Sequence, residues 1–392
     1  MAPKSLLRRI GVVDQLSAGW TAAGIYSRMM LRSLDSVCDQ AGIELYFLSS
    51  GDAGDQSTKA RLIQLAPAKS RVLRGELRLR HLLHLGDHSD PFSIAQKTGI
   101  DVLLPLLDVP PWEVKPKLIG WIPDLQHVHL PEFFSEPELQ KRNATLRRLS
   151  ERAALVMLSS QAARKDFVSF APQSEQKARV LSFPSLLAFE PLSENPESSR
   201  LKFKLPEKFA LVANQFWAHK NHRAVVSAAA QLRDGGIPVP IVMTGLPVDH
   251  RDRSNSNFSS LLQAIAAAGL NNQITILGQV SYADLVNLMR TAAVIIQPSR
   301  FEGWSTIVQD AKALGRPVIC SDIDVHREQD SKALGFFPCD EPKALAGVLA
   351  AHWSKLEPGP NKNLEASALA SEREFGRQHG ESLLKLCEEA CA

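Results

Sequence analysis

Residues 296–311 read IQPSRFEGWSTIVQDA and contain, in one short stretch, the parts from which an α/β fold is built. An apolar run ends at Gln297, a loop carries Glu302 and Gly303, and a helical pattern begins near Ser305. Strands that pass through short loops into helices are the repeating unit of parallel sheets. The stretch therefore predicts a doubly wound α/β domain in which Ser305 caps the helix.

The same alternation runs through the whole chain. Short continuous apolar runs are typical of strands that helices cover on both faces. The predicted strands are Arg9–Val13, Glu44–Leu48, Val102–Leu106, Leu118–Ile122, Leu155–Ser159, Ala210–Ala213, Pro240–Thr244, Ile274–Leu277, Val294–Gln297 and Pro317–Cys320. A polar stretch without periodicity, from Phe189 to Ser199, divides them into two groups.

This division predicts two doubly wound, Rossmann-like domains with a cleft between them. The N-terminal domain covers residues 1–190 and the C-terminal domain covers residues 201–365. Residues 366–392 have helical composition and are expected to form a C-terminal helix that packs back across both domains. A chain of 392 residues is also too long for a single core of average size.

The composition excludes several classes of protein. An apolar fraction of 44% with 22% charged residues is the balance of a globular protein. The formal charge of +3 is too small for nucleic-acid binding as the main task. The five cysteines are scattered and lack metal-ligand spacing, so they are predicted to be reduced thiols.

The N-terminal stretch predicts a cytoplasmic location. The basic residues 1–9 are not followed by an apolar run of signal-peptide length, because Asp14 and Gln15 interrupt it. No stretch approaches the roughly 20 apolar residues of a membrane span. Residues 69–88 place arginines among leucines, as in a basic helix that makes peripheral contact with the inner face of a membrane. A solvated helix face with buried leucines also explains that pattern.

The loop after Gln297 carries residues suited to a sugar nucleotide. Free amides at a helix start form a site for phosphate, and Gly303 lets a ligand approach the backbone. Glu302 could accept hydrogen bonds from sugar hydroxyls. Asp310 lies four residues after Thr306 on the same helix face, so the two carboxylates would bracket a sugar and a ribose. An acidic surface loop and a helix-surface aspartate remain the alternatives.

A second loop follows the predicted strand Ala210–Ala213. Lys220 in this loop could neutralise a diphosphate as a compact point charge at the carboxyl end of a strand. Gln215 can donate a hydrogen bond there but brings no charge. A solvated lysine is the alternative for Lys220. His219 and His222 lack metal-like partners and are expected to be structural or to lie just behind the site residues.

Two loops of the N-terminal half give weaker signals. The small-residue loop that contains Gly19 and Gly24 opens a helix and would let backbone amides approach phosphate or sugar, although a plain strand-to-helix turn looks the same. Asp124 and His127 follow the predicted strand Leu118–Ile122. A histidine with a pKa near neutrality can act as a proton partner, and a loop-ordering histidine is the alternative.

These motifs resemble the donor-site signature of retaining glycosyltransferases of family 4 (glycosyl transferases group 1), which have the two-domain GT-B fold. The resemblance extends almost continuously over the C-terminal half, from Leu277 to Asp322. It implies catalytic roles for Glu302 on the donor sugar, for Lys220 on the diphosphate and for His127 as an imidazole near the sugar or acceptor. The donor-binding positions that it implies are Gly19, Gly24, Asp124, Gln215, Gly303, Trp304, Ser305, Thr306 and Asp310.

The chain departs from the family pattern at three of these places. The family commonly has Arg where this chain has Gln215, so less charge meets the diphosphate on that side. It usually has Glu where Asp310 stands, and Asp is one methylene shorter. It has His where Pro123 stands, which makes His127 the nearest imidazole.

The resemblance implies transfer of a sugar, with retention, from a nucleoside-diphosphate sugar to a hydroxyl of a glycan or lipid-linked acceptor. Such a hexosyltransferase-type reaction would serve polysaccharide, O-antigen or glycolipid synthesis, with the N-terminal domain on the acceptor side. Neither a metal nor another cofactor is expected, because Lys220 and helix amides would meet the phosphate charge. An epimerase or a binding-only protein of the same fold, and a two-lobed sugar-binding protein, remain alternatives.

One motif points to a different class of enzyme. Asp322 and Asp324 have the Asp-x-Asp spacing of metal-dependent, single-domain glycosyltransferases. They follow the whole donor signature, in a chain with two α/β halves. We therefore interpret them as a loop at the end of a strand.

Overall fold

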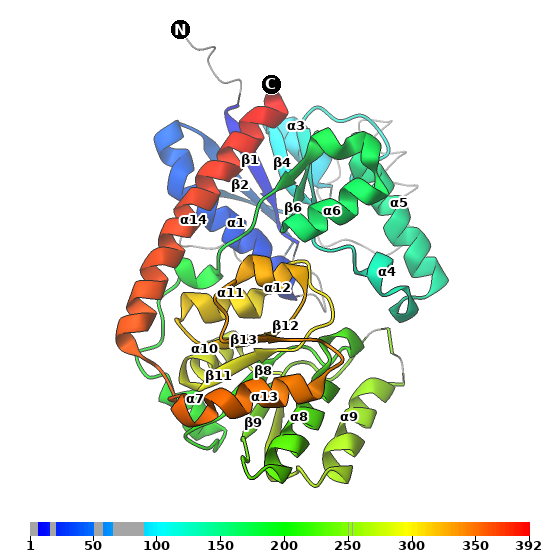
Figure 1. The fold of residues 1–392 in the computed structure, drawn as a ribbon. Coiled ribbons are helices and arrows are strands. Elements are labelled where there is room, and N and C mark those ends of the chain that lie inside the picture. Colours follow the sequence, from blue (N-terminus) through cyan, green and yellow to red (C-terminus); the bar gives the residue numbers. More distant parts are fainter. Residues whose placement is uncertain (1–6, 16–20, 51–57, 66–89, 250, 253) are drawn as a thin grey trace. The chain divides into compact units, whose positions relative to one another are not determined.

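The computed structural model describes residues 7–15, 21–50, 58–65, 90–249, 251–252 and 254–392 (Figure 1). It divides into two compact units, each built around one parallel sheet. Unit 1 consists of Met1–Leu125, Pro137–Phe189 and Arg373–Ala392, and unit 2 consists of Gln126–Glu136 and Glu190–Glu372. Gly19 and the basic stretch 69–88 lie outside the described residues.

Unit 1 contains a seven-stranded parallel sheet with the order β3-β2-β1-β4-β5-β6-β7. Its strands are β1 (Arg9–Val13), β2 (Glu44–Ser49), β3 (Arg61–Gln64), β4 (Val102–Leu106), β5 (Lys117–Ile122), β6 (Leu155–Leu158) and β7 (Ala178–Val180). Its helices are α1 (Thr21–Ala41), α3 (Pro91–Thr98), α5 (Glu136–Arg152) and α6 (Gln161–Phe170), with short 3-10 turns η2 (Pro172–Lys177) and η3 (Leu186–Ala188). Ile10 of β1 lies opposite Leu45 of β2 and Val102 of β4, which fixes the register at the centre of the sheet.

Apolar residues of α3, α5 and α6 pack with the strands into one hydrophobic core. Trp121 of β5 stacks on Tyr26 of α1, with ring centroids 3.8 Å apart. The long helix α14 (Lys362–Cys391) contributes its residues from Arg373 onward to this unit. Gly380 of α14 lies directly against the carbonyl oxygen of Ser33 in α1, so these two helices pack at close range.

Unit 2 contains a six-stranded parallel sheet with the order β10-β9-β8-β11-β12-β13. Its strands are β8 (Ala210–Ala213), β9 (Ile241–Thr244), β10 (Ile274–Gly278), β11 (Val294–Gln297), β12 (Val318–Ser321) and β13 (Gly335–Phe337). Its helices are α4 (Gln126–His129), α7 (Glu197–Lys202), α8 (His222–Asp234), α9 (Ser256–Ala267), α10 (Tyr282–Thr291), α11 (Thr306–Ala313), α12 (Asp324–Gln329), α13 (Pro342–His352) and the start of α14, with short 3-10 turns η1 (Pro131–Phe133), η4 (Ala218–Lys220) and η5 (Trp353–Lys355). Buried residues of α8, α9 and α13 form the core of the unit with the strands.

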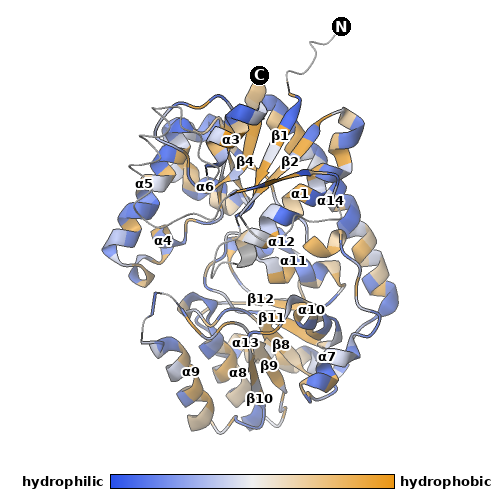
Figure 2. Ribbon diagram, turned by 180° about the vertical axis from the view of Figure 1, so that it is seen from behind, coloured by the Kyte–Doolittle hydropathy of each residue, from blue (hydrophilic) through white to orange (hydrophobic). Residues whose placement is uncertain are grey.

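The structure confirms the predicted α/β class and the parallel sheets, and each predicted strand is present. Figure 2 shows the strands mainly in hydrophobic colours, whereas the helices carry hydrophilic residues along part of their surface. The strands that the sequence did not predict, β3, β7 and β13, all lie at sheet edges. An edge strand is less covered than a central one, and β3 (RLIQ) is largely exposed, so β3 lacks the continuous apolar run of a central strand.

Two segments differ from the predicted domain assignment. Residues Gln126–Glu136, which the sequence placed in the N-terminal domain, group with unit 2. Helix α14 begins at Lys362 and gives its first turns to unit 2 and the remainder to unit 1. One helix therefore contributes residues to both units. In the described part of the chain no helix is long and apolar enough to cross a bilayer.

Candidate functional site

The donor-site candidates lie where the strand order of unit 2 reverses. Strands β8 and β11 are neighbours, β9 continues from β8 on one side, and β12 continues from β11 on the other. Ligands of doubly wound sheets bind at such a switch point, outside the carboxyl ends of the strands. The loops after β8 and β11, which carry Lys220 and Glu302, both leave the sheet there.

Lys220 and Glu302 form an ion pair. The Lys220 Nζ donates to Glu302 Oε1 at 2.5 Å, and the two side chains are 14% and 10% exposed. Both side chains are therefore largely buried, which differs from the solvated lysine and the acidic surface loop that were the alternatives. A second bond joins the two loops, from the Arg300 amide to the His219 carbonyl at 2.8 Å.

An amide pair beneath the ion pair holds Glu302 in place. Gln297, the last residue of β11, is fully buried and donates from Nε2 to Glu302 Oε1 at 2.8 Å. Its Oε1 accepts from Asn214 Nδ2 at 2.8 Å, and Asn214 directly follows β8. Sequence reasoning missed both residues. Their signal was an amide side chain at the carboxyl end of each of two apolar strands.

Ser305 caps helix α11, as the sequence predicted. Its Oγ accepts from the Val308 amide at 3.3 Å. The Ser305 amide itself donates to Gln329 Oε1 at 3.1 Å, and Gln329 Nε2 returns a bond to the Ser305 carbonyl at 2.7 Å. One of the amides expected to face phosphate is therefore occupied. The amides of Thr306 and Ile307, the first two of the helix, have no intrahelical acceptor because of their position.

Gly303 and Trp304 form the bend between Glu302 and the helix. Gly303 is buried and Trp304 is half-buried.

Asp310 lies in the second turn of α11 and is only 6% exposed. Its carboxylate is close enough to Tyr282 of α10 that, after burial of the phenol, it further raises the Tyr282 pKa. Asp310 therefore lies near the neighbouring helix α10. This environment differs from the helix-surface position that was the alternative.

Gln215 has a structural partner. Its Oε1 accepts from the Leu246 amide at 2.6 Å, which joins the loop after β8 to the loop after β9. Gly245 precedes Leu246 with a φ of +155°, and a Cβ at this position would lie 2.0 Å from the Asn214 carbonyl oxygen. The side chain of Gln215 thus fixes two loops against each other.

The segment Gln126–Glu136 brings two histidines to the same unit. His127 is buried in α4 and meets the Phe134 ring edge-to-face, with centroids 6.3 Å apart. His129 packs on Phe301, the residue before Glu302, with centroids 5.1 Å apart. The structure therefore places the three predicted catalytic residues in one unit. Lys220 and Glu302 are in contact. His127 is two residues before His129, the residue that packs on Phe301.

The candidates of unit 1 are arranged differently. Asp124 accepts from Arg142 Nη1 at 3.4 Å. Gly24 lies within helix α1, which begins at Thr21, and its carbonyl accepts from Ser27 Oγ at 3.1 Å. Gly24 is therefore a helical residue and not part of the predicted loop.

Asp322 and Asp324 do not act together in the structure. Arg327 binds both carboxylate oxygens of Asp322, at 2.5 and 2.8 Å, and this bidentate pair lowers the Asp322 pKa. Asp324 begins helix α12. Within the described ranges, no three His, Cys, Asp or Glu side chains are grouped so that they could hold a metal ion.

Two histidines beside the site are held neutral. Burial, helped by the nearby charge of Lys220, lowers the pKa of His222 to about 3, and the His222 ring stacks on Phe216. Burial also lowers the His326 pKa, although the charge of Glu302 opposes the shift. The His326 Nδ1 lies 3.1 Å from Ser321 Oγ, which donates to the Ser299 carbonyl in the loop after β11. The burial of His222 and its contact with Phe216 are consistent with the sequence prediction that it is structural or lies just behind the site residues.

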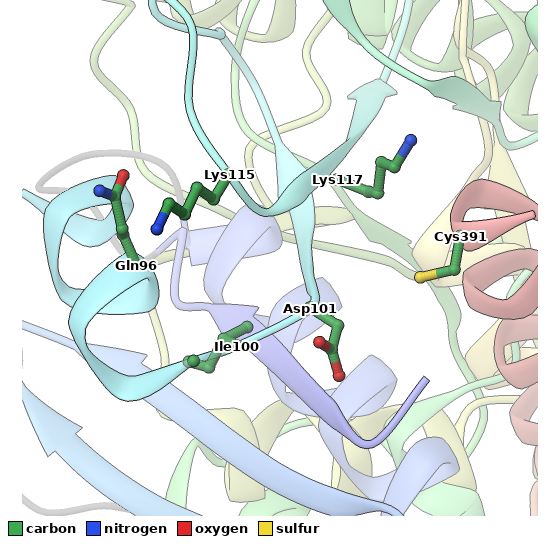
Figure 3. Close-up of a pocket in the computed structure, with 7 residues that line it drawn as sticks. Gln96, Ile100, Asp101, Lys115, Lys117 and Cys391 are labelled. Atoms are coloured by element: carbon green, nitrogen blue, oxygen red, sulfur yellow. The ribbon is translucent and has the colours of Figure 1, made fainter. Parts of the chain in front are cut away.

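A cavity of about 290 Å³ lies elsewhere, in unit 1 (Figure 3). It is lined by Gln96, Gly99, Ile100, Asp101, Lys115, Lys117 and Cys391. Asp101 precedes β4 and Lys117 begins β5, so the cavity is at the amino ends of the strands. Ligands of this class of sheet bind at the opposite edge, and we therefore place the functional site at the Lys220–Glu302 pair.

Residues 194–350 match the family model described as Glycosyl transferases group 1. No relative was found among the curated proteins. The match includes β8 to β13 and therefore the whole of the candidate site in the loops after β8 and β11.

Solved structures of similar fold cover nearly the full chain. A glycosyltransferase from Rickettsia africae ESF-5 is 16% identical, with a TM-score of 0.68 over 98% of this chain and 99% of that chain. Sucrose-phosphate synthase from Thermosynechococcus elongatus is 16% identical, with a TM-score of 0.63 over 97% and 96%. Anabaena Alr3699/HepE, in complex with UDP and glucose, is 14% identical, with a TM-score of 0.63 over 96% and 98%. These likenesses establish the GT-B fold for this chain.

Proposed function

We propose that this protein is a retaining glycosyltransferase of family 4 that transfers a sugar from a nucleoside diphosphate to an acceptor hydroxyl. The family match supports glycosyl transfer in general. The observation that carries the proposal is the Lys220–Glu302 pair at the switch point of the sheet in unit 2. A cation and a carboxylate held at this edge suit a diphosphate and a sugar, the two parts of a sugar nucleotide.

Lys220 would stabilise the leaving diphosphate. Negative charge develops on the phosphate oxygen as the glycosidic C–O bond breaks, and a preorganised cation lowers the energy of that state. Lys220 is paired with Glu302 in the structure. A bound diphosphate would share or take over this ammonium group, and the Thr306 and Ile307 amides would add the positive end of the α11 dipole.

Glu302 would bind the sugar. Its Oε1 already accepts bonds from Lys220 and Gln297, so sugar hydroxyls would be recognised through Oε2. We propose that the acceptor attacks from the face of the departing diphosphate, which takes the acceptor proton, so that configuration is retained. His127 would lie near the sugar or the acceptor.

The acceptor would be a glycan or lipid-linked saccharide, in the synthesis of a polysaccharide, an O-antigen or a glycolipid. The reaction would take place in the cytoplasm or at the inner membrane face.

The second candidate function is that of a sugar-nucleotide-binding protein or epimerase of the same fold. Transfer needs an acceptor, whereas an epimerase converts the donor alone. Product analysis with and without added acceptor separates the two.

Thermal-shift measurement with a panel of sugar nucleotides tests donor binding. A ligand at 100 times its dissociation constant stabilises the folded state by about 2.7 kcal/mol. We expect one nucleotide series to raise the melting temperature of the wild-type protein and not that of the Lys220→Met variant. A panel without any effect on the wild type would count against the proposal.

Chelation should leave activity largely intact. We propose that Lys220 and the helix amides meet the phosphate charge, and Asp322 is already engaged by Arg327. Transfer rates measured with and without EDTA should agree within about twofold. Loss of activity that Mn²⁺ or Mg²⁺ restores, and that Asp324→Ala abolishes, would place the protein in the metal-dependent class.

Asp310→Asn should raise the KM for the donor while turnover changes little. A ribose contact is similar in ground and transition states, so its loss weakens binding without slowing the chemical step. Asp310→Glu should be tolerated, because the added methylene restores the reach usual in the family. An unchanged donor KM in the Asn variant would show that Asp310 acts only through its contact with α10.

A further inference from the structure

We propose that Arg251, paired with Asp249, is a positioning residue that holds the segment Gln126–Glu136 against the loops that carry Lys220 and Glu302. This inference rests on the proposed function, because the segment carries His127. Arg251 lies in the connection between β9 and α9, and the motifs of the sequence gave it no role.

Arg251 is a nearly buried cation with a fixed geometry. Its Nε donates to Asp249 Oδ1 at 3.0 Å and its Nη2 donates to Oδ2 at 3.3 Å, with side chains that are 8% and 7% exposed. The Arg251 amide also donates to Asp249 Oδ1 at 3.0 Å. Asp249, in the same loop, therefore holds the planar guanidinium in a fixed orientation.

This guanidinium contacts the segment Gln126–Glu136 at Gln126 and Phe134. Arg251 Nη1 donates to Gln126 Oε1 at 3.0 Å, over a separation of 125 residues in the sequence. The guanidinium carbon lies 5.2 Å from the centroid of the Phe134 ring and 5.0 Å from that of Trp217. Cation–π contacts at this range favour Arg, and burial strengthens them. Both ends of the segment are thus held by one side chain.

The Arg251 side chain also connects the segment with the loop that carries Lys220. Trp217 immediately precedes η4, which ends at Lys220, and its Nε1 donates to the Val248 carbonyl at 3.3 Å. His129 of the segment packs on Phe301 beside Glu302. Arg251 therefore joins the loop that carries Lys220 to the segment that carries His127, and the segment in turn contacts the loop that carries Glu302.

The test compares Arg251→Gln, Arg251→Lys and, from the other side of the contact, Phe134→Leu. The control is Arg233→Gln, because Arg233 also binds a carboxylate and a carbonyl in unit 2 but lies at the far end of α8, away from the carboxyl ends of the strands. Hydrogen exchange is read at the amides of Leu130, Phe133 and Phe134, which donate within the segment. Transfer kinetics give kcat and the donor KM.

We expect Arg251→Gln to speed exchange in the segment at least about tenfold, because the segment loses its main tether to the unit. We expect kcat to fall on the order of 10- to 100-fold, with the donor KM within about threefold, since the misplaced segment affects the reaction and not donor binding. Arg251→Lys, which keeps the charge, and Phe134→Leu should lie between the wild type and Arg251→Gln. Arg233→Gln should match the wild type in every measurement.

Unchanged exchange in the segment of Arg251→Gln would overturn the proposal, and so would faster exchange with unchanged kcat. If Arg251→Gln does not fold, Arg251→Lys and Phe134→Leu decide by the same two measurements. A wild-type protein that transfers no sugar from any donor would sink the proposed function, while the exchange data would still decide whether Arg251 holds the segment.

Discussion

Replacing Glu302 by Gln or Lys220 by Met should lower turnover on the order of 100-fold or more, because in the proposed mechanism each change removes a preorganised charge that acts mainly in the transition state. Glu302→Gln keeps the shape of the side chain and removes its charge. Lys220→Met keeps the length of the stem and removes the cation. Steady-state kinetics with the donor identified by thermal shift measure both effects.

Because Lys220 and Glu302 form an ion pair, the same variants should also change the free energy of unfolding. The two side chains are 14% and 10% exposed, so each single change leaves a charge without its partner in a poorly solvated place. Loss of one partner should cost about 1–3 kcal/mol of unfolding free energy. The double variant should regain most of this stability but none of the activity. This difference separates a catalytic role from a structural one.

Lys202→Met is the matched control. Lys202 also pairs with a carboxylate of unit 2, with its Nζ 2.7 Å from Asp284 Oδ2, but it is 59% exposed. We expect its loss to leave turnover unchanged and to alter stability by less than about 1 kcal/mol. Near-normal turnover in a well-folded Lys220→Met or Glu302→Gln protein would remove that residue from the proposed site.

Gly245→Ala should destabilise unit 2 by about 3 kcal/mol and lower donor affinity at the same time. A Cβ at Gly245 would lie 2.0 Å from the Asn214 carbonyl oxygen and 2.6 Å from its carbonyl carbon. A backbone clash cannot be relieved by a rotamer change, so one of the two loops must move. Because Asn214 supports Gln297, which in turn supports Glu302, this displacement reaches the candidate site. Denaturant titration and the donor KM measure the two effects.

Two other glycines of unit 2 serve as controls. Gly347 lies inside helix α13 with open space around the position of a Cβ, so alanine there should stabilise the protein by about 0.5–1 kcal/mol. Gly236 has a φ of +78° and equally open space, so Gly236→Ala shows the cost of the backbone conformation alone, about 1 kcal/mol. A cost for Gly245→Ala no larger than that for Gly236→Ala would contradict the predicted clash.

Local sequence was sufficient to predict the central strands and to place Lys220 and Glu302 in the loops after two of them. Each of these residues follows an apolar strand by a few positions, and parallel strands end at one edge of a sheet. Whether the two side chains would pair could not be known, because that depends on the amide bonds from Gln297 and Asn214. The Ser305 cap was visible in the residue type alone. The hydrogen bond from the Ser305 amide to Gln329 could not be predicted, because Gln329 lies at the end of another helix, α12.

Contacts between distant parts of the chain escaped the sequence altogether. Arg251 and Gln126 are 125 residues apart, and neither lies in a periodic pattern that would indicate a partner. The segment Gln126–Glu136 was assigned to the N-terminal domain because it follows a strand of that domain. Its aromatic and amide side chains instead find their partners in unit 2. A sequence shows where a segment is attached but not against what it packs.

The course of the chain also decides how the protein can be divided for biochemical work. Unit 1 gathers Met1–Leu125, Pro137–Phe189 and Arg373–Ala392, so a fragment that stops at residue 189 lacks part of its own core. The partner fragment would carry the buried residues Leu383 and Leu386 without the helix α1 that Gly380 meets. We expect both fragments to aggregate. Unit 2 should be obtainable by itself only as residues 190–372 with a peptide of residues 126–136 added in trans.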